Sequence, residues 1–260
     1  MSEQEIIHRL NEALENGESA VLCSLIFKEG SGPRDPGAKM LVTADGKATG
    51  TIGGGGMERL LIGKALEVMG TGKPKTYHFA MGVPAREGMI PVDSKCGGEV
   101  KIFMDPIKPD PRLVIMGSGW IAQAVARYAT QCNFEIIVVD DAESAKAEWF
   151  PEGATIFNDK YPESLEQVKI RQSDYVAMLH GETGFEINGL RHAVKAKPAY
   201  IGLLGSGNKR KEHVKQLKSE GFDADVVETI SGPIGIDISA ETPEEIGVSI
   251  VAEIINKKRG

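Results

Sequence analysis

The chain has 260 residues, a length that favours two domains, and its 41% hydrophobic and 26% charged residues are typical of a soluble globular protein. The formal net charge of −7 argues against a general nucleic-acid binder and against a protein that acts on a membrane surface. The three cysteines form no CxxC pair, and the first residues contain no export signal and no membrane-length apolar run, so we expect a cytoplasmic protein with free thiols.

Residues 1–104 predict a small α+β domain. Ser2 and Glu5 form a capping box ahead of apolar residues at helical spacing, and Gly17 ends this helix. A β-rich stretch, a second helix and two further strands follow, separated by turns. The strands are expected at SAVLCSLIF, AKMLVT, ATGTI, KTYHFA and EVKIFM, the second helix at MERLLIGKALEVM, and an irregular loop at 81–98.

Residues 105–111, DPIKPDP, contain three prolines and predict a stiff linker between domains. From residue 112 to residue 260, apolar strands alternate with helices, which predicts a parallel sheet with right-handed crossovers. The strands are expected at RLVIM, EIIVVD, ATIF, YVAML and YIGLL, and the helices from Trp120, near Ala145, near Leu165, near Leu190, from Lys209 and from Thr242. The predicted fold class is α/β, with a C-terminal Rossmann-like parallel sheet and a smaller N-terminal α+β domain.

A glycine turn between the first strand and the first helix of the C-terminal domain predicts nucleotide binding. Gly117, Gly119 and Ala122 supply a tight turn, a close backbone approach to a pyrophosphate and close helix–strand packing. Asp140 ends the next strand, where a carboxylate accepts from a ribose hydroxyl and favours NAD(H) over NADP(H). The alternative is a Rossmann domain that keeps this turn for packing alone.

A second group of glycines lies in the N-terminal domain. Gly53, Gly54, Gly55 and Gly56 directly precede a predicted helix, and free amides at that position form a nest for an anion.

An upstream loop, residues 30–37 (GSGPRDPG), contains Arg34, and Lys39 follows it, so both cations are candidates for contact with a phosphate. The alternative is a long hairpin loop with a solvated arginine.

The remaining candidate residues lie where strands begin or end. Cys96 and Gly97 precede the strand EVKIFM, where a thiol is open to a ligand, whereas Cys23 and Cys132 have apolar surroundings. His180 follows the strand YVAML at the carboxyl edge of the parallel sheet; a capping or core histidine is the alternative. Gly205 and Ser206 form another strand-to-helix turn on that edge, and the basic run 209–211 is most simply a solvated helix face.

Taken together, these segments resemble the XdhC/CoxI family of xanthine dehydrogenase accessory factors, over nearly the whole chain. The resemblance is carried by GSGPRDPGAKMLVTADGKATGTIGGGGME, CGGEVKIF, MGSGWIAQAVARYA with VVDD, LLGSGNKRKE and GPIGIDISAETPEEIGVSIVAEII. At two positions the chain departs from the pattern common in that family. Gly56 stands where members often have cysteine, which leaves Cys96 as the only thiol in the motifs, and Trp120 stands where they often have histidine.

The resemblance implies a protein that binds molybdenum cofactor, as molybdopterin or its dinucleotide form, guards it during sulfuration and delivers it to a molybdenum hydroxylase. It implies such a hydroxylase and a cofactor sulfurase as partners, and a homodimer. We expect Gly53–Gly56, Arg34 and Cys96 to line one cofactor pocket facing the Rossmann cleft, with the Cys96 sulfur as a soft ligand of the metal.

Two other functions stay open at this point. One is an NAD(P)-dependent oxidoreductase that uses the Gly117 turn, with NAD as its cofactor and His180 as its proton donor. The other is a nucleotide-sensing regulator. The glycine-rich N-terminal domain, which a simple dehydrogenase does not require, favours a cofactor-insertion chaperone over a turnover enzyme.

Overall fold

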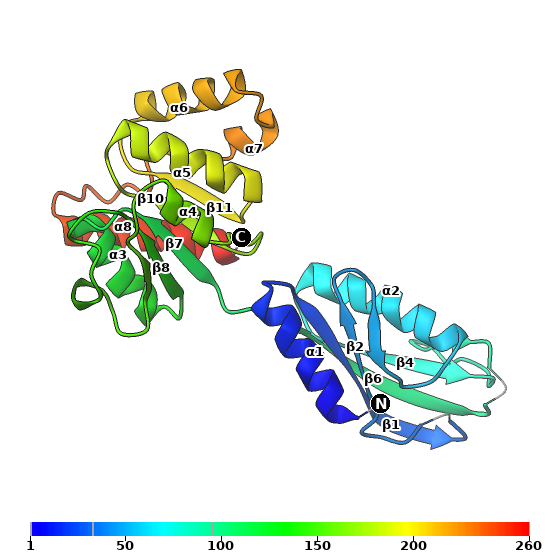
Figure 1. Cartoon of the computed structure of the whole chain (residues 1–260). Coiled ribbons are helices and arrows are strands. Elements are labelled where there is room, and N and C mark those ends of the chain that lie inside the picture. Colours follow the sequence, from blue (N-terminus) through cyan, green and yellow to red (C-terminus); the bar gives the residue numbers. More distant parts are fainter. Residues whose placement is uncertain (1, 33, 95, 260) are drawn as a thin grey trace. The chain divides into compact units, whose positions relative to one another are not determined.

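The computed structural model describes residues 2–32, 34–94 and 96–259, and the chain folds as two units, Met1–Pro109 and Asp110–Gly260 (Figure 1). Each unit has its own hydrophobic clusters. No helix within the described ranges is both long enough and apolar enough to cross a membrane.

The first unit is a mixed sheet with two long helices. Its strands follow the order β3-β2-β1-β6-β4-β5, antiparallel except for the β4–β5 pair. The elements are α1 (Glu3–Glu15), β1 (Ala20–Gly30), β2 (Lys39–Thr43), β3 (Ala48–Gly50), α2 (Gly56–Thr71), β4 (Lys75–Met81), β5 (Ile90–Val92) and β6 (Gly98–Ile107).

The two helices of this unit cover opposite faces of its sheet (Figure 1). Successive side chains of a strand point to opposite faces, so each strand contributes to two clusters. On β2, Leu41 packs with Ile6 and Ala13 of α1, whereas Met40 and Val42 pack with the apolar residues of α2. The Ser2 hydroxyl caps α1 by accepting from the Glu5 amide over 3.3 Å, as predicted for the helix start.

The predicted linker at 105–111 is partly wrong, because β6 continues to Ile107 and pairs there with β1. Pro106 lies opposite Val21 of β1, and the pairing of β6 with β4 ends at Met104. Beyond Met104, β6 therefore pairs with β1 alone and is an edge strand. A proline fits there because the open side of an edge strand needs no N–H donor. Residues 108–111 alone separate β6 from the next strand, which begins at Arg112.

The second unit is an α/β domain. Its strands are β7 (Arg112–Met116), β8 (Glu135–Val139), β9 (Thr155–Phe157), β10 (Tyr175–Met178) and β11 (Tyr200–Leu203). Its helices are α3 (Trp120–Gln131), the 3-10 turn η1 (Ala147–Trp149), α4 (Glu163–Gln167), α5 (Thr183–Ala196), α6 (Gly207–Ser219), α7 (Ala224–Glu228) and α8 (Pro243–Arg259).

All five strands of this unit are parallel, in the order β11-β10-β7-β8-β9. The strands are apolar on both faces because helices cover both. Leu113 and Ile115 of β7 pack against α3 and α8, whereas Val114 and Met116 pack against the layer that contains α5 and α6. Figure 1 shows the helices of these two layers on either side of the sheet. The predicted Rossmann-like sheet is confirmed.

Two secondary-structure elements differ from the prediction, and the start of a third agrees with it. The helix expected near Ala145 is the single 3-10 turn η1, and β5 lies within the segment expected to be an irregular loop. Helix α8 begins as predicted: the Glu245 carboxylate accepts from the Thr242 amide over 3.0 Å, and the Thr242 hydroxyl accepts from the Glu245 amide over 3.2 Å.

Candidate functional site

Backbone pairing brings two glycine segments of the first unit together. Gly30 at the end of β1 pairs with Gly98 at the start of β6, and the Ser31 amide donates to the Gly97 carbonyl over 3.2 Å. A Cβ on Gly30 would lie 2.5 Å from the Gly97 carbonyl oxygen, so a larger residue does not fit at this approach. The loop after β1 and the segment before β6 are therefore neighbours.

The glycine run before α2 combines a backbone that requires glycine with open space beside it. Gly54 and Gly55 have φ angles of +137° and +55°, a region that side chains with a Cβ rarely adopt. A Cβ on Gly54, Gly55 or Gly56 would meet nothing within 4 Å. Among the described residues, the amides of Gly53, Gly54 and Gly55 have no acceptor. Amides placed at the start of a helix in this way suit an anion.

A hollow of about 240 Å³ joins this glycine run to Cys96. It is lined by Gly53, Gly54, Gly56, Met57, Met81, Val92, Asp93, Ser94 and Cys96. Cys96 is a partly buried free thiol, and its amide donates to the Ser94 hydroxyl over 3.1 Å. The described residues contain no group of three His, Cys, Asp or Glu side chains arranged as metal ligands. The structure thus places the predicted glycine run and the predicted thiol on one hollow.

The two cations predicted for this site lie outside the lining of the hollow. Arg34 is exposed and forms no hydrogen bond or ion pair with a described residue. Lys39 donates to the Glu3 carboxylate over 2.5 Å and to the Gly37 carbonyl over 3.2 Å, and its ammonium lowers the pKa of the Glu3 carboxyl. Arg34 is therefore available to an anion, whereas Lys39 is occupied by a carboxylate of α1.

In the second unit, the candidate residues lie at the carboxyl edge of the sheet, where the strand order reverses between β7 and β10. Gly117 follows β7 with a φ of +121°, and a Cβ there would lie 2.8 Å from the amide nitrogen of His180, which follows β10. A Cβ on Gly119 would meet nothing within 4 Å. Packing alone therefore explains Gly117, whereas Gly119 faces open space.

Asp140 ends β8 beside this turn and is 2% exposed. Its Oδ2 accepts from the Ser118 hydroxyl over 2.7 Å, and its Oδ1 accepts from the Ala142 amide over 3.1 Å. The His180 Nε2 lies 3.6 Å from the same Oδ1. A ribose hydroxyl would have to replace one of these neighbours, so the ribose contact and the preference for NAD(H) stay predictions.

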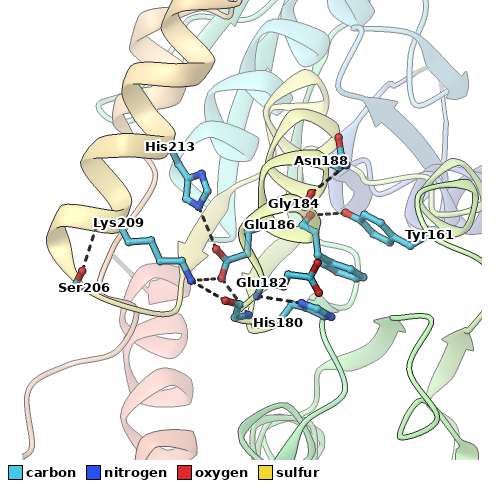
Figure 2. A network of polar contacts seen from close by, with 11 residues as sticks. Tyr161, His180, Glu182, Gly184, Glu186, Asn188, Ser206, Lys209 and His213 are labelled. Atoms are coloured by element: carbon cyan, nitrogen blue, oxygen red, sulfur yellow. Dashed lines mark hydrogen bonds and ion pairs between the residues drawn. The ribbon is translucent and has the colours of Figure 1, made fainter.

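His180 is held by the loop that begins α5 (Figure 2). Its Nδ1 accepts from the Glu182 amide over 3.2 Å, and its ring stacks on Phe185 with the ring centroids 3.8 Å apart. Phe185 stacks in turn on Tyr161, whose hydroxyl donates to the Phe185 carbonyl over 2.7 Å. The imidazole is therefore fixed in orientation and faces Asp140 through Nε2.

A buried carboxylate ties this loop to α6 (Figure 2). Glu186 is fully buried and accepts from the Gly181 amide over 3.1 Å and from Lys209 Nζ over 2.6 Å. The His213 Nε2 lies 3.1 Å from its other oxygen. A buried carboxylate requires such partners, because burial without them strongly disfavours the charged form.

The predicted turn at Gly205 and Ser206 begins α6. Gly205 has a φ of +129°, and the Ser206 hydroxyl accepts from the Lys209 amide over 3.3 Å. The Ser206 side chain therefore caps a helix, and a ligand contact by it stays a prediction.

The sequence of the second unit decides the family. The model of the XdhC Rossmann domain matches residues 113–254, more than half of the chain. The chain belongs to the XdhC family. The model of the XdhC and CoxI family matches residues 13–80, so both units of this XdhC-family chain carry family sequence.

Relatives and solved structures extend this result. The chain is 34% identical over 239 residues to the uncharacterized protein YqeB of Escherichia coli, covering 91% of this chain and 43% of YqeB, less than half the length of that relative. It is 26% identical over 274 residues to the molybdenum cofactor insertion chaperone PaoD of E. coli, covering 94% of this chain and 85% of PaoD. The crystal structure of a xanthine dehydrogenase from Bacillus halodurans has the same fold. The two chains are 21% identical with a TM-score of 0.52, and the match covers 100% of this chain and 96% of that one.

Sequence reasoning missed Glu186, Lys209 and His213 of this XdhC-family chain. The basic run 209–211 was expected to be a solvated helix face, which is wrong for two of its residues. Lys209 binds Glu186, and the Arg210 guanidinium donates to the Ile230 carbonyl over 2.5 Å and to the Glu228 carbonyl over 2.7 Å. A usable signal existed: a lysine in the first turn of a helix opposes the helix dipole, so a compensating carboxylate is expected nearby.

Proposed function

We propose that this XdhC-family chain is a molybdenum cofactor-binding maturation factor, which protects the cofactor and delivers it to a molybdenum hydroxylase of the xanthine dehydrogenase or CO dehydrogenase type. Family membership supports the proposal, as does the similarity to PaoD, which is named as a molybdenum cofactor insertion chaperone and aligns with 94% of the chain. A homodimer, a cofactor sulfurase partner and a cytoplasmic location belong to the same proposal.

The observation that carries the proposal is the hollow shared by the glycine run and Cys96. The residues fit the cofactor in two respects. Three glycine positions have space where a Cβ would stand, and amides beside them lack an acceptor, as a phosphate site requires. A partly buried thiol lines the same hollow and is the soft donor that a molybdenum centre accepts.

We therefore assign the phosphate end of the cofactor to the amides of Gly53, Gly54 and Gly55, and the metal end to Cys96. The bound group would supply the dithiolene-held molybdenum that the client enzyme needs. The chain would bind this group, orient it by its phosphate and limit the access of water and oxidants to its metal end. None of these tasks requires turnover, which agrees with a chaperone.

Filling the hollow without disturbing α2 tests this function. Gly56 lines the hollow, has no positive φ and leaves open space at its Cβ position, so Gly56→Leu should fill the site while improving the helix. We expect purified Gly56→Leu protein to contain far less molybdenum and pterin than the parent after expression together with cofactor biosynthesis. It should also fail to activate a cofactor-free molybdenum hydroxylase.

The matched control is Gly63→Leu, the same replacement in the same helix. Gly63 is exposed and a Cβ there also meets nothing within 4 Å, but it does not line the hollow. This variant should retain parental cofactor content. Equal cofactor content in the parent and in a folded Gly56→Leu protein would show that the hollow is not the cofactor site.

A further inference from the structure

Both tryptophans of the chain lie together on the surface of the second unit. The chain has two tryptophans. Trp120, the first residue of α3, is 71% exposed, and Trp149, the last residue of η1, is 47% exposed. Their ring centroids are 6.4 Å apart and their planes meet at 77°. Indole rings are large apolar groups that proteins usually cover, so a pair left open marks a surface for binding.

The pair stands between two hollows of about 370 Å³ each, a size within the range of small-molecule sites. The other residues that line the first hollow are Gly119, Gln123, Glu143, Ser144, Lys146 and Glu148. The second hollow also contains Gln123, Arg127, Gln131, Glu148, Phe150 and Pro151. The surface is thus concave and combines apolar walls with a few polar groups, as small-molecule sites do, whereas a protein interface is usually flatter and wider.

The two indole rings are nearly perpendicular and form a corner, not the slot that two parallel rings would form. At 77° between planes, a flat ligand can stack on the face of one indole while its edge meets the other. Lys146 is exposed and forms no ion pair with a described residue, so its ammonium is available to an anionic group of the same ligand. A flat ring joined to an anion is the chemistry of a nucleotide.

The position of the corner agrees with that chemistry. Trp120 follows Gly119 directly, and Gly119 lines the first hollow and has open space at its Cβ position. Ser144, which also lines the first hollow, forms a hydrogen bond of 2.6 Å with the Ser118 hydroxyl of the same turn. A base at the corner would leave its phosphate near the turn at the carboxyl edge of the parallel sheet, where such folds bind ligands.

We propose that Trp120 and Trp149 form a stacking site for the base of a nucleotide, with its phosphate toward the Gly119 turn and Lys146. The base is recognised by the indole faces, and this recognition does not depend on a ribose contact at Asp140, whose oxygens accept hydrogen bonds from Ser118 and Ala142. Two sources offer this chemistry: a free nucleotide such as NAD, and the nucleotide half of a dinucleotide cofactor. The site is independent of the hollow at Cys96, and its existence does not rest on the proposed function.

The two tryptophans make the test direct, because no indole outside this site contributes to the fluorescence of the chain. The full chain is titrated with NAD⁺, AMP, GMP and CMP, and with ribose 5-phosphate, which lacks a base. We expect saturable quenching by at least one nucleotide and none by ribose 5-phosphate. Quenching by NAD⁺ or AMP alone favours a free nucleotide, and quenching by CMP or GMP favours the nucleotide half of a dinucleotide cofactor.

Affinities of variants are then measured by calorimetry. Trp120→Ala and Trp149→Ala should each weaken nucleotide binding by a factor of roughly 5 to 150, the range for losing one base–aromatic stack. The matched control is Phe27→Ala, which removes an aromatic ring that is 38% exposed in the first unit and should leave affinity unchanged. Both tryptophans are exposed, and circular dichroism should show parental folding in both variants.

Three results would overturn the proposal. The first is the absence of binding by every nucleotide at millimolar concentration. The second is binding that both tryptophan variants retain at parental affinity. The third is a concentration-dependent association of the chain, seen by sedimentation, that both variants abolish while nucleotides have no effect on it, because the pair would then be an interface between copies of the chain.

Discussion

Arg34 and Cys96, the two side chains that we propose as cofactor contacts, differ in their surroundings. The Arg34 guanidinium is exposed and without a partner among the described residues, while the Cys96 thiol is partly buried in the wall of the hollow. An arginine of this kind gains a charge-assisted hydrogen bond when a phosphate approaches, whereas a thiol in a wall contributes through a soft metal contact. Loss of the two side chains should therefore have distinguishable effects.

Arg34→Ala should weaken retention of molybdenum cofactor by roughly 1.5–3 kcal/mol, the value of a hydrogen bond to a charged group. Cys96→Ser should retain the phosphate end but leave the bound cofactor more easily oxidised. Cofactor content after purification, with and without exposure to air, measures both effects. Arg259→Ala and Cys132→Ser are the controls, since both residues belong to the second unit and neither is part of the glycine loops or the hollow of the first unit. Parental retention and parental air stability in both test variants would remove Arg34 and Cys96 from the site.

Arg112, the first residue of β7, forms a buried ion pair with Asp174 that stabilises the second unit. Arg112 is 8% exposed and donates to Asp174 through Nε over 3.0 Å and through Nη2 over 2.6 Å. Asp174 also accepts from the Arg171 amide over 2.7 Å, and Arg112 donates to the Lys169 carbonyl over 2.8 Å. The pair therefore joins the start of β7 to the turn before β10.

Asp174→Ala should lower the free energy of unfolding by about 3–5 kcal/mol, because it leaves the Arg112 guanidinium buried without a counter-charge. Arg9→Ala breaks the pair with Glu12 on α1, whose side chains are both largely exposed, and should change stability by no more than about 1 kcal/mol. Urea unfolding of both variants measures the difference. A similar small effect in the two variants would contradict the role assigned to the buried pair.

Among the secondary-structure elements, those with a strong periodic pattern and a visible start or stop were predictable. Strands β7, β10 and β11 were expected from apolar runs and α8 from its capping box. Strand β5 was missed because it has three residues, one of them Pro91, and is held in place by its parallel pairing with β4. Short elements such as this depend on tertiary pairing, which a local pattern does not contain.

The packing of α8 on α3 depends on a small residue that sequence periodicity does not single out. Gly247 lies inside α8, and a Cβ there would lie 2.9 Å from the Ala124 Cβ on α3. Gly247→Ala should therefore lower stability despite the better helix propensity of alanine, because two short, rigid side chains would overlap. Gly63→Ala in α2 places its Cβ in open space and should raise stability by roughly 0.5–1 kcal/mol.

Thermal unfolding measures the stability of the two glycine variants, which can be compared directly because both replace glycine by alanine inside a helix. The expected result is opposite signs of the stability change. A stabilised Gly247→Ala protein would mean that α8 can move away from α3 without loss.

For the whole molecule, the fold class followed from the alternation of apolar strands and helices in the second half of the chain. Part of the candidate site was predictable too, because glycines that precede a helix and a thiol beside glycines are local features. The Glu186 network was not predictable in this way. Its members come from the start of α5 and from α6, and only the order of β10 and β11 in the sheet brings them together. The tryptophan pair likewise joins α3 to η1, two elements whose approach no local pattern indicates.

Burial across both units also sets how the whole molecule responds to alkali. Burial raises the pKa of the Cys23 thiol to about 12, and it raises the pKa of the phenols of Tyr161, Tyr175 and Tyr200. Each group therefore keeps its proton in the folded chain at a pH where the unfolded chain has lost it. Above the ordinary thiol pKa of 9.0 the unfolded state binds fewer protons, so the free energy of unfolding must fall as pH rises.

We expect stability to be nearly constant from pH 7 to 8 and to fall from about pH 9 upward, with a limiting slope near 1.4 kcal/mol per pH unit for each such group. The loss of stability due to Cys23 begins at a lower pH than that due to the tyrosines, because a thiol ordinarily titrates near 9.0 and a tyrosine near 10.0. Cys23→Ala should lower stability at pH 7 through the small cavity it leaves, yet flatten the dependence between pH 9 and 10. Urea unfolding at a series of pH values measures both slopes. A parental slope retained in Cys23→Ala would show that another group is responsible for the loss of stability in that window.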